Sequence, residues 1–234
     1  EPENRTFTLT RARSEAPAVS SRKVSNDIGY IRASHLTERT APEVRAAFRQ
    51  LQGARPLRGL VLDLRNSPGG LLTASVEIAA MFLAPDAMIV RLEGHLPESN
   101  QTLTADRHAI QKNRFAGKDA WPDAMTSVPL IVLVNAGTAS GSEIIAAALR
   151  DNGRARLIGS KTFGRGSIQT VRQLTKDSAI KLTTAFYKTP GGQPLQGNGL
   201  DPDAQAPDPE RTTDAGTALD AGLSKAMALL RSAP

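Results

Sequence analysis

Hydrophobic residues along this chain alternate between two spacings, one typical of buried strands and one typical of helices. Short apolar runs and period-2 stretches predict strands. They occupy residues 28–33, 57–64, 88–92, 129–134, 155–159, 167–174 and 179–187. In the last of these, alternate residues share one face, and the turn at 175–178 predicts a hairpin with the strand before it. That face carries Ile180, Leu182, Thr184 and Phe186.

Four other stretches repeat apolar residues every three or four positions, which predicts amphipathic helices. Two of them begin after residues 40 and 71, and a third spans residues 140–151. The fourth is terminal and carries Leu219, Leu223, Met227 and Leu230. A Thr-x-x-Glu pattern at Thr40 and Glu43 predicts a capping box for the first helix. Because strands and helices interleave along the whole chain, the predicted fold class is α/β.

Two polar segments interrupt this pattern. Residues 93–127 contain few apolar positions and are expected to form a surface excursion with a short helix near 105–113. Residues 6–10 read Thr-Phe-Thr-Leu-Thr, a period-2 strand with no partner strand before it in this sequence. We expect it to be the last strand of a preceding unit.

Composition narrows the function classes. The 234 residues, 40% hydrophobic, suffice for one main domain, and the formal charge of +6 is scattered, so nucleic-acid binding is only weakly supported. The chain has no cysteine, which excludes disulfides and thiolate nucleophiles. Its three histidines show no metal-ligand spacing, and no apolar run is long enough to span a membrane.

Two small-residue turns lie between a predicted strand and a predicted helix, where backbone N–H groups are free to bind an oxyanion. The first contains Gly69 and Gly70, and the second reads Thr-Ala-Ser-Gly-Ser-Glu from residue 138. Ser140 is a candidate nucleophile with the Gly141 N–H beside it. Ser140 and Glu143 also fit an ordinary Ser-x-x-Glu capping box, and on these residues alone the cap is the more common outcome.

Three segments together change that balance. Residues 63–72 read DLRNSPGGLL, residues 138–144 read TASGSEI, and residues 162–169 read TFGRGSIQ. In this order they resemble the signature segments of the carboxyl-terminal processing, or tail-specific, peptidases of serine peptidase family S41. The likeness continues through 187–203, so it covers roughly residues 28–203.

The resemblance implies a ClpP/crotonase-like spiral core of β-β-α units. In this family a PDZ domain precedes the protease core, so residues 1–13 would be the remnant of its last strand. Residues 14–210 would form the protease core, and residues 211–234 a C-terminal helix packed on it. No metal and no cofactor are implied.

The family uses a serine and lysine dyad, in which lysine takes the hydroxyl proton of the attacking serine. By resemblance Ser140 is the nucleophile, and Gly141 and the turn at Gly69 and Gly70 supply the oxyanion donors. Glu143 and Gln169 fall on positions that orient the lysine. The lysine position itself is occupied by Arg165.

This substitution matters because a buried lysine can lose its proton near neutral pH, whereas arginine stays protonated. We therefore expect a serine endopeptidase whose cleavage is weakened or lost while peptide binding survives. Lys161 is an alternative base, although a solvated loop lysine is favoured there. Two other functions stay open: a non-catalytic peptide-binding scaffold on the same fold, and, more remotely, a crotonase-like acyl-transfer enzyme.

The expected substrates are unfolded proteins or the C-terminal segments of proteins. Binding to an adaptor protein and assembly into a homo-oligomer both stay open. Binding to nucleic acid is not expected. By resemblance the location is the periplasm or cell envelope of a bacterium, and a cytoplasmic location stays open.

Overall fold

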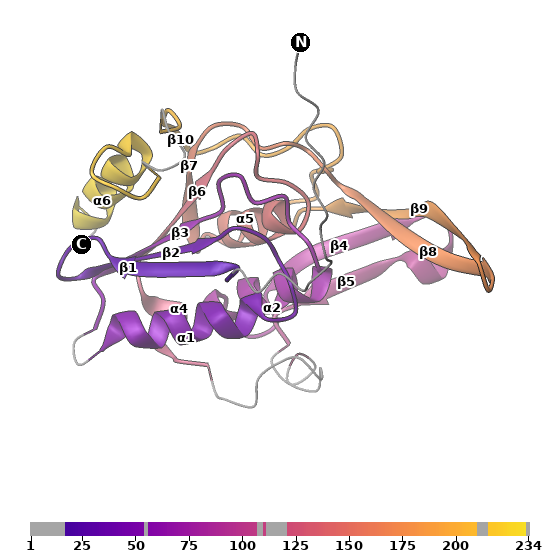
Figure 1. The fold of residues 1–234 in the computed structure, drawn as a ribbon, viewed down its shortest axis with the longest axis horizontal. Helices are drawn as coiled ribbons and strands as arrows, with labels where there is room; N and C mark the ends of the chain where they lie inside the picture. The colour runs from indigo at the N-terminus through magenta and orange to yellow at the C-terminus, as the bar shows by residue number, and fades with distance from the viewer. Residues whose placement is uncertain (1–16, 54–55, 107–109, 111–120, 210–214, 233–234) are drawn as a thin grey trace, which may run out of the picture.

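The computed structural model describes residues 17–53, 56–106, 110, 121–209 and 215–232. Within them the strands form two sheets (Figure 1). The larger sheet has the order β1-β2-β3-β6-β7-β10, and the smaller has the order β5-β4-β9-β8. The strands of the larger sheet are β1 (Val19–Lys23), β2 (Ile28–Ala33), β3 (Gly59–Asp63), β6 (Leu130–Val134), β7 (Ala155–Gly159) and β10 (Ala204–Gln205).

The central strands β2, β3, β6 and β7 run parallel, and every residue of β3 and β6 is buried. Their sequences, GLVLD and LIVLV, are almost continuously apolar because both faces of a parallel sheet are covered. The parallel arrangement also brings the carboxyl ends of β3, β6 and β7 to one edge of the sheet.

Helices cover both faces. On one face α1 (Thr40–Gln52), α2 (Leu72–Phe82) and α5 (Gly141–Asp151) pack in the larger core cluster, with the short α4 (Ala124–Ser127) against α2. On the opposite face α6 (Ala221–Ser232) packs on β3, β6 and β7 (Figure 1). Successive side chains of a strand point to opposite faces of the sheet, so the residues of each central strand are divided between the two core clusters.

The smaller sheet consists of β5 (Gln101–Thr104), β4 (Met88–Gly94), β9 (Ser178–Lys188) and β8 (Ser167–Thr175), and the 3-10 turn η1 (Pro97–Ser99) lies between β4 and β5. The predicted hairpin is β8–β9, which extends away from the body (Figure 1). Its apolar face points outward: Ile180, Leu182 and Phe186 are between 38% and 50% exposed.

The α/β class is confirmed, and the predicted strands and helices recur within a few residues of their expected bounds. The predicted capping box at Thr40 is wrong, because Thr40 is the first helical residue and Arg39 stands at the N-cap. The Thr40 hydroxyl instead donates to the His35 carbonyl. Leu219 is 76% exposed and precedes α6, so it does not belong to that helix.

Some expectations fall outside the described residues. They are the strand at 6–10, with its assignment to a PDZ remnant over 1–13, and most of the helix near 105–113. The division of the chain at residues 13/14 and 210/211 stays a prediction. Strands β1, β5 and the short β10 were not predicted.

A buried ionic network ties the end of β3 to α6. The Arg65 guanidinium donates to Asp63 at 2.7 Å and to Asp220 at 2.5 Å, and all three side chains are at most 3% exposed. Tyr30 donates its hydroxyl to Asp63 at 2.6 Å. Burial, the largest influence, would raise the pKa of Asp220, but the hydrogen bonds from Arg65, Gly216 and Leu223 together with the charge of Arg65 outweigh it, and the pKa is lowered. Asp220 also caps α6 by accepting the Leu223 N–H.

A second buried pair joins α1 to α2. Glu77 and Arg45 are both 3% exposed, their nearest charged atoms are 3.9 Å apart, and neither Glu77 Oε1 nor Arg45 Nη1 has a hydrogen-bond partner among the described residues. Glu43 of α1 also has a buried oxygen without such a partner. Burial raises the pKa of Glu77 to about 7, and the attraction of Arg45 only partly opposes this shift.

Because the folded state binds this proton more readily than the unfolded chain, we expect the free energy of unfolding to fall as pH rises from about 5 to 7 and to level off above. The total decrease should be on the order of 1–3 kcal/mol. Urea denaturation between pH 5 and 8 measures it. Glu77→Gln should flatten the profile and the exposed Glu98→Gln should not; an unchanged slope in Glu77→Gln would contradict the assignment.

Candidate active site

Three loops meet at the N-terminus of α5. We call them the glycine turn (66–71, after β3), the serine turn (135–141, after β6) and the arginine loop (160–166, after β7). Since β3, β6 and β7 are parallel neighbours, their carboxyl ends deliver all three loops to the same place. The three sequence segments singled out above therefore form one site.

The glycine turn and the serine turn are joined by hydrogen bonds. The Ala139 N–H donates to the Ser67 carbonyl at 2.9 Å, and the Ser142 hydroxyl donates to the Ser67 hydroxyl at 2.8 Å. Asn135 accepts from the Asn66 N–H at 2.8 Å and donates its amide back to the Asn66 side chain at 3.0 Å. This pairing fixes the relative position of the two turns.

Ser140 has an unusual backbone. Its φ of 53° and ψ of −119° lie far from the extended conformation that an N-cap residue ordinarily adopts. A non-glycine residue in such a conformation costs about 1–3 kcal/mol, and strain of this kind concentrates at functional sites. A sharp strand-to-helix turn is also the local structure that presents a nucleophilic serine in α/β-hydrolases. The capping box of Ser140 and Glu143 predicted from the sequence is present, but an ordinary cap does not account for this backbone conformation.

Two backbone N–H groups lie beside Ser140. Gly141 begins α5, and Gly70 N would lie 3.5 Å from a methyl group built on Gly141. In the described part of the chain neither N–H donates a backbone hydrogen bond. Gly69, at φ 84°, fits so closely that a methyl group there would lie 2.6 Å from Gly141 N. A hydroxyl with two free N–H donors is the arrangement that acyl transfer needs.

Leu36 holds the glycine turn in place through its backbone. Its N–H donates to the Gly69 carbonyl at 2.9 Å, and its carbonyl accepts from the Leu71 N–H at 3.0 Å. Gly70, between these bonds, has φ 152° and leaves no room for a side chain against Leu36. The Gly70 N–H is thereby held in one orientation.

The Glu143 carboxylate connects the serine turn to the arginine loop. It is fully buried and accepts four hydrogen bonds. Oε2 accepts from the N–H groups of Ser140 at 2.8 Å and Arg165 at 2.9 Å. Oε1 accepts from the Thr162 hydroxyl at 2.5 Å and the Gly164 N–H at 2.7 Å. The backbones of residues 140 and 165 therefore share one acceptor oxygen.

The predicted site residues divide into two groups. Ser140, Gly141, Gly69, Gly70, Glu143 and the backbone of Arg165 come together. The Arg165 guanidinium lies over the exposed Phe163 ring, 5.0 Å from its centroid. Gln169 is exposed on β8, and no hydrogen bond among the described residues links it to Glu143 or Arg165. Lys161 pairs with Asp201 at 3.6 Å, and both side chains are more than half exposed.

Sequence reasoning did not assign a role to Thr162, Ser67 or Leu36. Thr162 and Ser67 lie inside the three signature segments. Their hydroxyl side chains, in segments shared with Gly69 and Gly70 or packed beside Glu143, were the signal that could have found them. Leu36 acts through its main chain, which leaves no signature in the sequence.

None of the helices in the described part of the chain is long and apolar enough to cross a membrane. Nor do its described residues bring three metal-ligating side chains together.

Glu143→Gln is expected to lower the free energy of unfolding by about 2–4 kcal/mol, because one amide oxygen cannot accept four hydrogen bonds and buried donors lose their partner. Urea denaturation at pH 7 measures the loss. The exposed Glu38→Gln is the matched control. A change in Glu143→Gln within about 0.5 kcal/mol, the usual range for surface substitutions, would show that the carboxylate does not hold the loops.

Comparison with known proteins identifies relatives over most of the chain. The model of peptidase family S41 matches residues 27–206. The carboxy-terminal-processing protease of Bartonella bacilliformis is 39% identical over 81% of this chain and 41% of its own length. The carboxyl-terminal-processing protease of Synechocystis sp. is 40% identical over 84% and 43%. The chain thus spans about two fifths of the length of these curated relatives.

The fold also matches solved structures. A photosystem II D1 C-terminal processing protease superposes with a TM-score of 0.68 at 34% identity, covering 87% of this chain and 52% of the other. A structure described as a putative S41 protease from Bacteroides fragilis gives a TM-score of 0.68 at 21% identity, which speaks for the fold alone.

Proposed function

The chain belongs to peptidase family S41, and we propose that it is the protease core of a serine endopeptidase that processes proteins near their C-termini. We propose further that its cleavage is weakened or abolished by Arg165. The single observation that carries the proposal is the Glu143 carboxylate, which binds the backbones of residues 140 and 165 beside two free N–H groups.

In this proposal Ser140 is the nucleophile. Its Oγ attacks the carbonyl carbon of the scissile peptide bond, and the resulting oxyanion accepts hydrogen bonds from the N–H groups of Gly70 and Gly141. The C–N bond then breaks, the amine leaves with a proton, and water hydrolyses the Ser140 ester. Gly69 contributes its tight turn, which brings the Gly70 N–H against Gly141. The chemistry requires no metal and no cofactor.

The proton of Ser140 must pass to a base, and residue 165 is the proposed position for it. Glu143 Oε2 accepts hydrogen bonds from the backbone N–H groups of both Ser140 and residue 165. A lysine at position 165 would therefore have its backbone fixed beside that of Ser140. Arginine in that position cannot serve as the base, because its guanidinium remains protonated and has no acceptor lone pair. Glu143 would orient the base by fixing its backbone. For Gln169 we retain an orienting role as a proposal.

The proposed substrates are unfolded proteins and the C-terminal segments of proteins, in line with the names of the relatives. We also propose a periplasmic or envelope location. A substrate-delivering adaptor and a homo-oligomer complete the proposed partners.

A second candidate function is a peptide-binding scaffold without catalysis. Arg165 favours it, because a permanently charged, exposed guanidinium stacked on Phe163 is suited to binding rather than to proton transfer.

Digestion of casein by three chains tests the proposal: the chain itself, Arg165→Lys, and Arg165→Lys combined with Ser140→Ala. Cleavage that appears with the lysine and disappears with Ser140→Ala supports the protease. If all three chains bind casein and none cleaves it, the scaffold replaces the protease.

A further inference from the structure

The β8–β9 hairpin, which extends from the body (Figure 1), gathers exposed apolar side chains at one place. Because alternate residues of a strand share a face, Ile180, Leu182 and Phe186 all lie on the outer face of β9. Leu174, beside the turn, is 65% exposed. We call these four side chains the apolar patch. Exposed apolar side chains gathered in this way mark a site that another surface covers.

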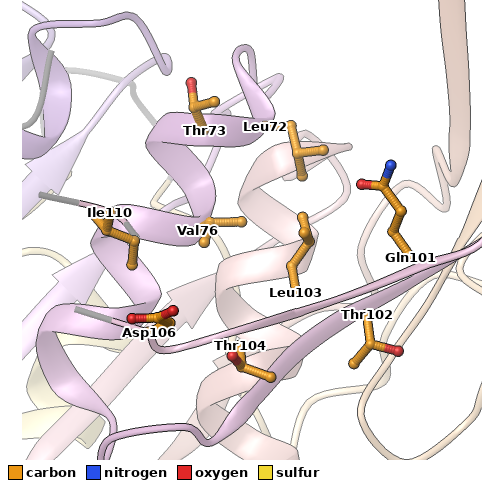
Figure 2. Close-up of a pocket in the computed structure, with 9 residues that line it drawn as sticks. All are labelled: Leu72, Thr73, Val76, Gln101, Thr102, Leu103, Thr104, Asp106 and Ile110. Carbon is orange, nitrogen blue, oxygen red and sulfur yellow. The ribbon is translucent and has the colours of Figure 1, made fainter. Parts of the chain in front are cut away.

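The opposite edge of the same sheet is not open in this way. Strand β5 lies beside α2, and its Leu103 lines a groove of about 460 Å³ together with Leu72 and Val76 of the helix (Figure 2). Leu103 is partly buried against the main core. On the hairpin, by contrast, every residue from 169 to 183 is exposed. The described part of the body therefore leaves the hairpin uncovered.

The hairpin is basic as well as apolar. Between residues 171 and 182 it carries one carboxylate, that of Asp177, and three cations, which are Arg172, Lys176 and Lys181. Within the described part of the chain none of the three cations forms an ion pair. Arg172 lies directly opposite Ile180 and thus on the face of the apolar patch. A negatively charged surface is the complement of this one.

A second copy of the chain does not provide that complement. Symmetric contact between two such hairpins would bring their cations together. Pairing along the free edge of β8 is also disfavoured, because the register of β8 shifts between Ile168 and Gln169 and again between Gln173 and Thr175. The hairpin is thus poorly suited to its own copy and to an added strand.

The size of the patch separates a folded protein from a lipid surface. A stable protein interface takes about 20–30 residues on each side, many more than the hairpin offers. A lipid surface makes no such demand, because apolar side chains enter the boundary between headgroups and acyl chains one by one. Each Lys or Arg near anionic headgroups strengthens such binding by about fivefold. Their apolar stems can lie beside the patch while the charged ends reach the phosphates.

We propose that the β8–β9 hairpin docks the protein on an anionic lipid surface. The apolar patch enters the boundary between headgroups and acyl chains, and Arg172 and Lys176 contact the lipid phosphates. The hairpin lies on the membrane and does not cross it. Since β8 has nine residues and starts at the arginine loop, docking holds that loop within about 30 Å of the hairpin turn. The proposal does not depend on the protease function.

Co-sedimentation with lipid vesicles tests the proposal. The vesicles contain phosphatidylcholine alone or phosphatidylcholine with an equal part of phosphatidylglycerol. Leu174→Thr and Leu182→Thr each remove apolar surface from the patch and keep a residue that suits a strand. Leu219→Thr is the matched control, since Leu219 is 76% exposed and lies outside the hairpin.

Charge is tested separately with two double variants of equal net charge. Arg172→Gln with Lys176→Gln acts on the hairpin. Lys23→Gln with Arg156→Gln removes two exposed cations from the larger sheet and is the control. A difference between the two variants therefore reports the position of the charges, and not their number.

We expect the protein to sediment with the anionic vesicles and not with the neutral ones. Leu174→Thr and Leu182→Thr should each weaken binding by about tenfold. The double cation variant of the hairpin should weaken it by about 25-fold, from about fivefold for each cation. Both controls should bind as the parent chain does.

Insertion of the patch is measured with a dye. Since the chain has no cysteine, Leu174→Cys can carry a single environment-sensitive fluorophore, and Leu219→Cys is again the control. On addition of anionic vesicles the emission of the dye at residue 174 should shift to shorter wavelength, while that at residue 219 should not.

Failure to bind anionic vesicles overturns the proposal, and so does equal weakening by the hairpin variants and their controls. Bound protein whose dye at residue 174 shows no shift would overturn it as well. If the vesicles are not bound and Leu182→Thr instead dissociates a dimer seen by sedimentation without lipid, a second copy covers the patch.

Discussion

Replacing Arg165 with lysine is expected to raise the rate of casein cleavage by about 10²- to 10⁴-fold, the usual contribution of a positioned general base. The physical reason is the difference between the two cations. Lysine has an ordinary pKa of about 10.4, and contact of its amine with Ser140 and a bound substrate would desolvate it and lower that pKa, so that a neutral fraction becomes available near pH 7. Arginine has none.

The rate of Arg165→Lys should rise with pH and level off above the pKa of the new lysine, because only the neutral amine accepts the Ser140 proton. Lys161→Ala in the same background should retain the gain, since Lys161 pairs with Asp201 at the surface. Loss of the gain in Lys161→Ala would move the base to that residue. No gain at any pH would remove residue 165 from the mechanism.

Arg65→Met is expected to destabilise the fold by about 3–5 kcal/mol, because it leaves the buried carboxylate of Asp220 without its cation and leaves Asp63 with only Arg32, at 3.3 Å. That is a large part of the 5–15 kcal/mol by which a domain is typically stable. Urea denaturation at pH 7 measures the loss, and poor soluble yield would accompany it. Arg39→Met is the control, since its exposed pair with Glu43 should contribute at most about 1 kcal/mol.

Adding Asp220→Asn to Arg65→Met should recover part of the stability, because one of the stranded charges is then removed. Equal stability of Arg65→Met and Arg39→Met would show that the network contributes little to the fold.

The sequence predicted those parts of the fold that depend on local pattern. The buried strands β3 and β6 stand out as apolar runs, and Ser140 and Glu143 lie within one short segment that carries its own helix start. Strand β5 was missed because its sequence, QTLT, is short and mostly polar. It is a strand only because β4 lies beside it.

Long-range contacts could not be predicted from the sequence, for a different reason. Arg65 and Asp220 are 155 positions apart, and no local pattern relates them. The sequence placed Glu143 beside Ser140, but it could not indicate that the Glu143 carboxylate would bind the main chain of residue 165. Only the pairing of β6 with β7 brings the two loops together.

That last contact has an evolutionary consequence. Glu143 holds residue 165 by its N–H, which every amino acid except proline provides, and the side chain itself projects into solvent over Phe163. The hydrogen bond that holds residue 165 therefore forms equally well with lysine or arginine at this position. Under the proposed mechanism, catalytic gain and loss would then be single-substitution events, and the fold could serve a hydrolase or a binding protein without a change of architecture.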